Sequence, residues 1–168
     1  MKRGIVVDTN VPVVANRQSA QASPECVLAC VQRLGRITNE TESLVLDNQY
    51  LIIMEYIHNL ASSGQPGVGD AFLKWVLTNW ANPQRCQLVR ITPLNGQKAT
   101  FQEFPAVPDL AGFDPSDRKF VAVALAHGQQ PPILQAVDSK WWQFKDALHR
   151  NGVQVDFLCE QDIQRLLS

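Results

Sequence analysis

Five short apolar segments are spaced along the chain, and segments with helical periodicity separate them. The apolar segments occupy residues 4–7, 43–48, 86–91, 133–138 and 153–158. The first lacks polar alternation, which is typical of a strand that is buried on both faces of a parallel sheet. Alternating strands and helices predict a parallel sheet with helices on both faces. We therefore predict an α/β chain of the three-layer α/β/α class, with a central, mainly parallel sheet of five strands.

The intervening segments carry the start and stop signals of helices. Ser23 precedes Pro24 and Glu25, which predicts a helix N-terminus, and an apolar stripe then runs to a predicted end at Gly35. Further helices are predicted from residue 11 and over residues 49–61, 70–81, 114–128, 139–152 and 160–167. Residues 92–113 follow neither pattern, and loops of this length in a compact domain are usually functional or mobile.

The length and composition indicate one globular domain, which we place at residues 1–168. Such a chain can bury about two thirds of its unfolded surface, so it needs no disulfide or metal to fold. Cys26, Cys30, Cys86 and Cys159 are therefore expected to be small buried hydrophobes, because a zinc site would need better spacing or nearby histidines. The three histidines are expected to be structural or solvated.

Charge and hydropathy narrow the choice of partners. The net charge of −1 does not favour a nucleic-acid binder, although a basic rim around an acidic site would also sum to such a value. The apolar run behind Arg3 is broken by Asp8, so no secretion signal is expected. No stretch is long and apolar enough to span a bilayer. We expect a cytoplasmic protein with no membrane partner.

Acidic residues stand where predicted strands end and helices begin. Asp8 ends the first strand, Asp138 ends the fourth, and Asp117 lies in the first turn of the helix that precedes the fourth strand. Glu55 lies one to two turns into the helix after the second strand. Ligands of open α/β sheets bind outside the carboxyl ends of the strands. Four carboxylates from distant segments can therefore meet at one edge of the sheet.

A cluster of this kind must be neutralised. Two unit charges about 4 Å apart repel by about 4 kcal/mol at an effective dielectric of 20. Raised pKa values, basic partners or divalent cations can offset this repulsion, and hard oxygen ligands suit Mg²⁺ or Mn²⁺. The structural alternatives are helix caps for the aspartates, Asp114 included, and a rim position for Glu55. The four acids together, rather than any one of them, predict a metal site.

Four short motifs in this order resemble the PIN-domain nucleases. They are VVDTNV at 6–11, IIMEYI at 52–57, DPSDRKFVAVALAHG at 114–128 and LQAVDSKWW at 134–142, which carry Asp8, Glu55, Asp117 and Asp138. Their order and spacing match over nearly the whole chain. The resemblance implies a PIN-like fold and a Mg²⁺- or Mn²⁺-dependent ribonuclease, in which these four acids hold one or two metal ions and water attacks a phosphodiester.

The resemblance also suggests supporting residues. Asn10 matches a polar position that supports the first acid, Ser139 matches the polar position after the last acid, and Asp114 opens the third motif. Three basic residues near the acids in sequence could contact substrate phosphates, namely Arg118, Lys119 and Lys140.

The resemblance further implies an RNA substrate, most simply cut internally. A role as the toxin of a toxin–antitoxin pair would add an antitoxin protein as a partner, and a homodimer is a further expectation. The family's small toxins are usually shorter: the predicted helix at 70–81 with its flanking loop resembles an addition, and the region at 92–113 is also long. That difference leaves the subfamily open.

Other functions fit the sequence less well. A phosphotransferase of the haloacid dehalogenase kind needs a second aspartate two residues after the first, where this chain has Asn10, and a receiver domain needs paired acids early in the chain. No Ser-His-Asp arrangement, glycine-rich phosphate loop or cysteine–histidine pair is visible. The remaining alternative is a non-catalytic module of the same fold that binds RNA or a protein, although retention of all four acids argues against it.

Overall fold

The centre of the computed structural model, which describes residues 2–94 and 99–168, is a sheet of five parallel strands. The strands are β1 (Gly4–Val7), β2 (Ser43–Asp47), β3 (Cys86–Val89), β4 (Ile133–Gln135) and β5 (Val155–Phe157). Their order across the sheet is β3-β2-β1-β4-β5, and each neighbouring pair is parallel. The predicted α/β class and the five-stranded parallel sheet are confirmed.

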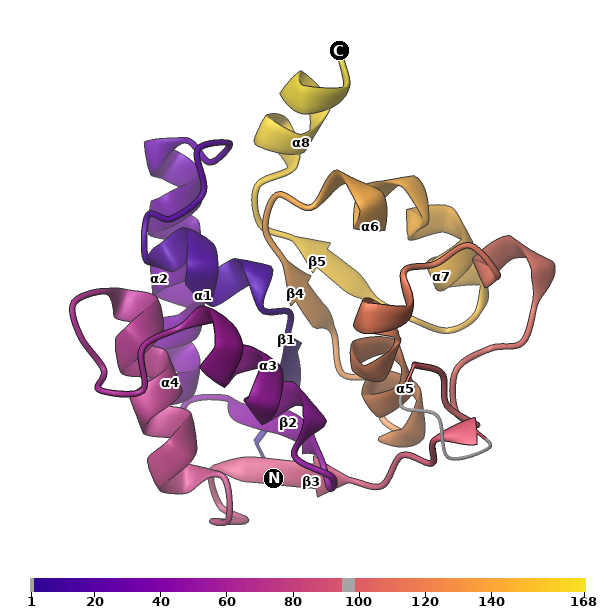
Figure 1. The fold of residues 1–168 in the computed structure, drawn as a ribbon, viewed down its shortest axis with the longest axis horizontal. Helices are drawn as coiled ribbons and strands as arrows, with labels where there is room; N and C mark the ends of the chain where they lie inside the picture. The colour runs from indigo at the N-terminus through magenta and orange to yellow at the C-terminus, as the bar shows by residue number, and fades with distance from the viewer. Residues whose placement is uncertain (1, 95–98) are drawn as a thin grey trace.

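Helices cover both faces of the sheet (Figure 1). The helices α1 (Asn10–Ala15), α2 (Pro24–Thr38), α3 (Leu51–Asn59) and α4 (Val68–Asn79) connect β1 to β2 and β2 to β3. The helices α5 (Arg118–Ala126), α6 (Ser139–Gln143) and α7 (Lys145–Arg150) connect β3 to β4 and β4 to β5, and α8 (Glu160–Leu167) ends the chain. Right-handed crossovers place the first group on one face and the second group on the other, because the chain reverses its direction across the sheet after β3.

The strands β1, β2 and β4 form the buried centre of the sheet. Every residue of these three strands is buried, which explains the lack of polar alternation in their sequences. Val6 pairs with Ile133 and Val7 with Leu134, and the Asp8 amide donates to the Leu134 carbonyl at 3.1 Å. The chains leaving β1 and β4 turn to opposite faces of the sheet, and ligands of such sheets bind at this switch point.

Apart from shifts of one or two residues at helix ends, three predicted helices differ from the structure. Gly35 does not end its helix, because α2 continues to Thr38 and buries Ile37 on the same apolar stripe. The predicted helix over 139–152 is divided into α6 and α7 at Phe144. The predicted helix over 114–128 begins with a 3-10 turn, η3 (Pro115–Asp117), before α5 starts.

The long predicted loop over 92–113 is well anchored where the structure describes it. Phe101, Phe104 and Phe113 are buried, and a short 3-10 turn, η2 (Pro108–Leu110), buries Leu110. Residues 95–98, which also belong to this predicted loop, lie outside the described residues. The aromatic side chains therefore fix the described part of the loop against the core.

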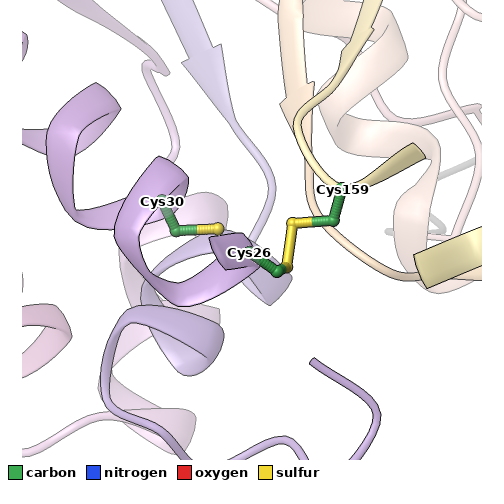
Figure 2. A group of neighbouring side chains, drawn as sticks. All are labelled: Cys26, Cys30 and Cys159. Atoms are coloured by element: carbon green, nitrogen blue, oxygen red, sulfur yellow. A yellow bond between two sulfur atoms is a disulfide. The ribbon is translucent and has the colours of Figure 1, made fainter. Parts of the chain in front are cut away.

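A disulfide joins Cys26 in α2 to Cys159, the residue before α8 (Figure 2). The Cα atoms of this pair lie 5.1 Å apart. The expectation that all four cysteines are unpaired hydrophobes is wrong for these two, whereas Cys30 and Cys86 are free and buried. Cysteine pairs this distant in sequence cannot be matched without the fold.

In the described part of the chain, none of the helices combines the length and the apolar character needed to cross a membrane.

Candidate metal centre

Asp8 follows β1, the central strand, and its side chain is almost completely buried. Its Oδ2 accepts a hydrogen bond from the Asn10 amide at 2.9 Å, whereas its Oδ1 is buried with no partner among the described residues. Burial raises the pKa of this carboxyl well above its usual value, and the nearby charges of Asp117 and Glu55 raise it further. A buried carboxylate oxygen that no protein donor satisfies is suited to a proton or a cation.

Asp47 shows how a purely structural aspartate behaves at the end of a neighbouring strand. Like Asp8, it is nearly inaccessible to solvent. Its carboxylate accepts hydrogen bonds from the amides of Gln49 at 3.0 Å and of Leu51 and Ile52 at 2.9 Å each. Asp47 therefore accepts hydrogen bonds from backbone amides at the start of α3. Asp8 accepts only one backbone amide among the described residues, and its other oxygen has no partner there.

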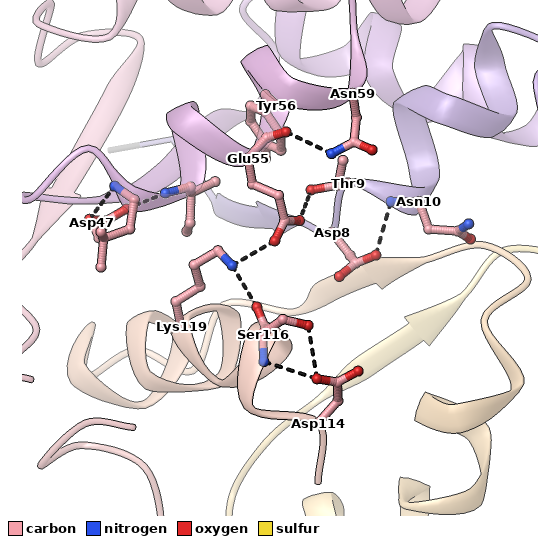
Figure 3. A network of polar contacts seen from close by, with 12 residues as sticks. Asp8, Thr9, Asn10, Asp47, Glu55, Tyr56, Asn59, Asp114, Ser116 and Lys119 are labelled. Carbon is pink, nitrogen blue, oxygen red and sulfur yellow. Dashed lines mark hydrogen bonds and ion pairs between the residues drawn. The ribbon is translucent and has the colours of Figure 1, made fainter. Parts of the chain in front are cut away.

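Glu55 projects from the second turn of α3 toward Asp8 (Figure 3). Its Oε1 accepts a hydrogen bond from Lys119 Nζ at 2.6 Å, and its Oε2 accepts one from the Thr9 hydroxyl. Lys119 also donates to the Ser116 carbonyl at 2.5 Å, so its ammonium joins α3 to the turn before α5. The Lys119 side chain is only 13% exposed. The expected phosphate contact of Lys119 would therefore require this ion pair to open.

Asp117 ends η3 and directly precedes α5. Burial raises the pKa of its carboxyl to about 7, and the charges of Asp114, Asp138 and Glu55 act in the same direction. Asp138 is the N-cap of α6, and its Oδ1 accepts the Lys140 amide at 2.9 Å. Asp138 therefore does not end β4, as the sequence predicted, but lies three residues beyond it. These charge effects indicate that Asp8, Glu55, Asp117 and Asp138 lie in one neighbourhood.

The acids do not form a closed cage. Within residues 2–94 and 99–168, no three carboxylates place oxygen atoms within 4.8 Å of one another. Mg²⁺ usually keeps several water ligands and takes only one or two carboxylates directly. The arrangement therefore fits a partly hydrated cation better than one that is enclosed by protein ligands.

Asn10 connects the segment that carries Asp8 to the segment that carries Asp138. Its Oδ1 accepts the Val137 amide at 2.8 Å, and its own amide donates to Asp8. Asn10 thereby links the start of α1 to the segment just before Asp138. A position that supports the first acid was expected here, and the contacts are consistent with such a supporting role.

Asp114 and Lys140 form an ion pair at the rim. Asp114 accepts a hydrogen bond from Lys140 Nζ at 2.8 Å and another from the Ser116 amide at 3.0 Å, and these bonds lower the pKa of its carboxyl to about 2. Ser139 opens α6 between Asp138 and Lys140 and is half-buried. Lys140 is 59% exposed, so its ammonium can move toward a substrate more easily than that of Lys119.

Arg118 holds the loop before α5. Its Nε and Nη2 donate to the Phe113 carbonyl at 3.2 and 3.1 Å, its Nη2 donates to the Ala111 carbonyl at 3.0 Å, and its Nη1 donates to the Thr100 hydroxyl at 3.2 Å. The guanidinium also lies 4.7 Å from the centre of the Phe104 ring. All of its nitrogen atoms are engaged in the protein, so the expected phosphate contact does not fit Arg118.

Two residues beside the acids were missed from the sequence. Gln135 on β4 is fully buried, and its side chain lies close enough to Asp8 to lower the pKa of that carboxyl, although its Nε2 makes no hydrogen bond of normal geometry in the described chain. Thr9 positions Glu55 through its hydroxyl. Gln135 could have been found from the sequence, because it is a polar residue inside an apolar strand. Nothing comparable in the sequence marks Thr9.

Comparisons with known proteins give no match to this chain, either among family models, among curated proteins or among solved structures. The resemblance to PIN-domain nucleases therefore rests on the four motifs alone.

The metal-free protein should be more stable near pH 5 than near pH 8. The pKa of Asp117 rises from 3.8 to about 7 on folding, so between these values the folded chain holds a proton that the unfolded chain has lost. Stability then falls as the pH rises through this window, and between pH 5 and the folded pKa of about 7 the loss is on the order of 3 kcal/mol. The raised pKa of Asp8 acts in the same direction.

Urea unfolding in EDTA at the two pH values measures this effect, and Asp117→Asn should flatten the dependence. Three other acids have lowered pKa values and act below about pH 4, outside the window: Asp70, Asp114 and Asp162. Stability that rises from pH 5 to pH 8 in the wild type would contradict the prediction.

Proposed function

We propose that this protein is a divalent-metal-dependent ribonuclease that hydrolyses phosphodiester bonds of single-stranded RNA. The observation that carries the proposal is the buried Oδ1 of Asp8, which has no hydrogen-bond partner in the described chain and lies after the central strand beside Glu55 and Asp117. The site offers carboxylate oxygens, the donors that suit Mg²⁺ or Mn²⁺. Asp8, Asp117 and Asp138 would hold the cation, with Glu55 for a second ion or for the attacking water.

A bound divalent cation would supply Lewis-acid polarisation of the phosphate and a water molecule of lowered pKa. The chain's own groups would bind the cation and orient the substrate. Asp117, whose pKa is about 7 in the metal-free protein, would release its proton when it binds the cation. Glu55 is fixed in orientation by Thr9 and Lys119 and could direct a water molecule. Lys140 is the basic residue best able to contact a phosphate, because it is the most exposed of the three candidates.

The depth of the site favours a single-stranded substrate. Asp8 is 4% exposed, so a reacting phosphate must come close to a recessed acid. A flexible single strand can adopt the bend that this requires, whereas a rigid duplex resists it. Toxin activity with an antitoxin partner, and a homodimeric state, are narrower forms of this proposal that rest on the resemblance alone.

One observation favours a second candidate function, a non-catalytic module that binds RNA or a protein. The ammonium of Lys119 already neutralises Glu55 at 2.6 Å. The acid cluster is therefore partly compensated without any metal ion. In such a module the acids would persist as a polar binding surface, and metal binding would not lead to cleavage.

Incubation of the purified protein with single-stranded RNA tests the proposal. We expect cleavage with Mg²⁺ or Mn²⁺, no cleavage in EDTA, and little cleavage with Ca²⁺, whose looser geometry positions water poorly. The control is an Asp8→Asn, Asp138→Asn double variant purified in parallel. Equal cleavage by this variant would reveal a contaminating nuclease, and no cleavage of RNA or DNA despite bound metal would favour the second candidate.

A further inference from the structure

A cluster of three cysteines lies where α2 meets the segment before α8 (Figure 2). The Sγ atoms of Cys26, Cys30 and Cys159 all lie within 4.8 Å of one another, and the three side chains are buried. In the described residues this is the one group of three or more potential metal-ligating side chains with such short mutual distances. Figure 2 shows the Cys30 side chain directed toward the Cys26–Cys159 disulfide.

The cluster is held together by contacts other than the disulfide. Cys26 and Cys30 are one turn apart in α2 and so share one face of the helix. The Ser23 amide, at the start of α2, donates to Asp162 Oδ2 in α8 at 2.7 Å, and Ile163 in α8 is fully buried. These contacts should keep Cys159 near α2 when the disulfide is reduced.

We propose that reduction of the Cys26–Cys159 disulfide turns this cluster into a Zn²⁺ site with Cys26, Cys30 and Cys159 as ligands. One dithiol, or two molecules of a monothiol, gives two electrons and two protons to the disulfide and is itself oxidised to a disulfide. Zn²⁺ then replaces the protons of the three thiols, which are released to solvent. Tetrahedral Zn–S bonds of about 2.3 Å place sulfur atoms about 3.8 Å apart, which the observed spread of the cluster accommodates.

A pocket beside the cluster leaves room for a fourth ligand. This pocket has a volume of about 500 Å³, and its lining includes Cys26, Cys159, Glu25 and Glu160. No fourth cysteine, histidine or carboxylate of the described chain joins the three sulfurs within 4.8 Å, so water from the pocket would complete the tetrahedron. The three soft sulfur ligands favour Zn²⁺, whereas the hard oxygen ligands around Asp8 favour Mg²⁺ or Mn²⁺.

Metal binding suits these sulfurs better than exchange of the disulfide onto Cys30. Exchange would require a thiolate to form on the fully buried Cys30 side chain, away from solvent, before it could attack the disulfide. A divalent cation overcomes the same burial, because its charge compensates the thiolates that it creates. The reduced cluster is therefore a better ligand set than a nucleophile.

Titration of the reduced, metal-stripped protein with Co²⁺ under anaerobic conditions tests this site. We expect thiolate-to-cobalt charge-transfer absorption that saturates at one ion per chain and is lost when Zn²⁺ displaces the Co²⁺. The oxidised protein should give no such absorption. Cys30→Ser should weaken Co²⁺ binding at least about tenfold, since losing even an outer-shell partner costs metal sites 10- to 100-fold. Cys86→Ser removes a buried free cysteine outside the cluster and should bind like the wild type.

A second readout avoids any effect of the substitutions on folding. Zn²⁺ should raise the unfolding midpoint of the reduced wild-type protein. The proposal is overturned if this midpoint does not change, if reduced wild type shows no charge-transfer absorption, or if folded Cys30→Ser binds Co²⁺ as tightly as wild type. A Cys26–Cys30 or Cys30–Cys159 disulfide as the main product of mild reduction and reoxidation, identified by mass spectrometry, would also overturn it in favour of exchange.

Discussion

Asp8→Asn should reduce RNA cleavage by at least about 10³-fold and leave the metal-free protein at least as stable as the wild type. Loss of a metal ligand removes several kcal/mol of charge stabilisation in the transition state, which corresponds to a rate loss of this size. The same change removes a buried carboxyl group that lies beside Glu55 and Asp117 and has one oxygen with no partner among the described residues. The folded protein thus loses a repulsion, and the site loses a metal ligand. Such an exchange of activity for stability is expected at strained functional sites.

Asp47→Asn is the matched control, because Asp47 is equally buried at the end of the neighbouring strand. Its carboxylate accepts three backbone amides, so the substitution should lower the free energy of unfolding by about 2 kcal/mol or more. Urea unfolding in EDTA and cleavage with Mn²⁺ give both quantities for each variant. A loss of stability in Asp8→Asn as large as that in Asp47→Asn would make Asp8 a structural cap instead.

Loss of the Cys26–Cys159 disulfide should lower the free energy of unfolding by about 5 kcal/mol when no metal is present. The bond joins residues that are 133 positions apart, and closing so long a loop removes much of the conformational entropy of the unfolded chain. Unfolding of the oxidised protein and of the reduced protein in EDTA measures the difference. For most domains a loss of this size is a large part of the total stability.

Cys159→Ser should reproduce the effect of reduction, and adding a reductant to this variant should change nothing further. Cys86→Ser is the control, because Cys86 is buried and free and its replacement leaves the disulfide in place. An unfolding midpoint of the wild type that is the same with and without reductant would contradict the predicted contribution of the bond.

The sheet could be predicted because its strands are buried on both faces and alternate with helices, so pattern alone determines the class. The different roles of Asp8 and Asp47 could not be predicted. Both acids end a buried strand, and a helix follows each. The turn after Asp47 contains Tyr50 at φ 65°, and this left-handed residue lets the carboxylate reach several amides at the start of α3. Whether a carboxylate is satisfied in this way depends on turn geometry that residue types do not encode.

The roles of the basic residues beside the acids could not be predicted from the sequence either. Arg118 and Lys119 are adjacent in sequence, and at the start of a helix they point in different directions. Only the fold determines that Lys119 meets Glu55 while Arg118 holds the carbonyls of the preceding loop. The pairing of Cys26 with Cys159 likewise depends on how α8 returns to α2. Chain topology therefore predicted which segments meet, and side-chain directions decided what each residue does.

The most direct test of the metal centre is the dependence of stability on Mn²⁺ in the oxidised protein, where the cysteine cluster is closed by its disulfide. Urea unfolding is measured across a Mn²⁺ titration for the wild type and for the Asp8→Asn, Asp138→Asn double variant. At 100 times its dissociation constant, Mn²⁺ should stabilise the wild type by about 2.7 kcal/mol, because it binds only the folded chain. The double variant should show no such stabilisation. Equal stabilisation of both proteins, or none in the wild type at saturating Mn²⁺, would contradict the assignment of these acids as a metal centre.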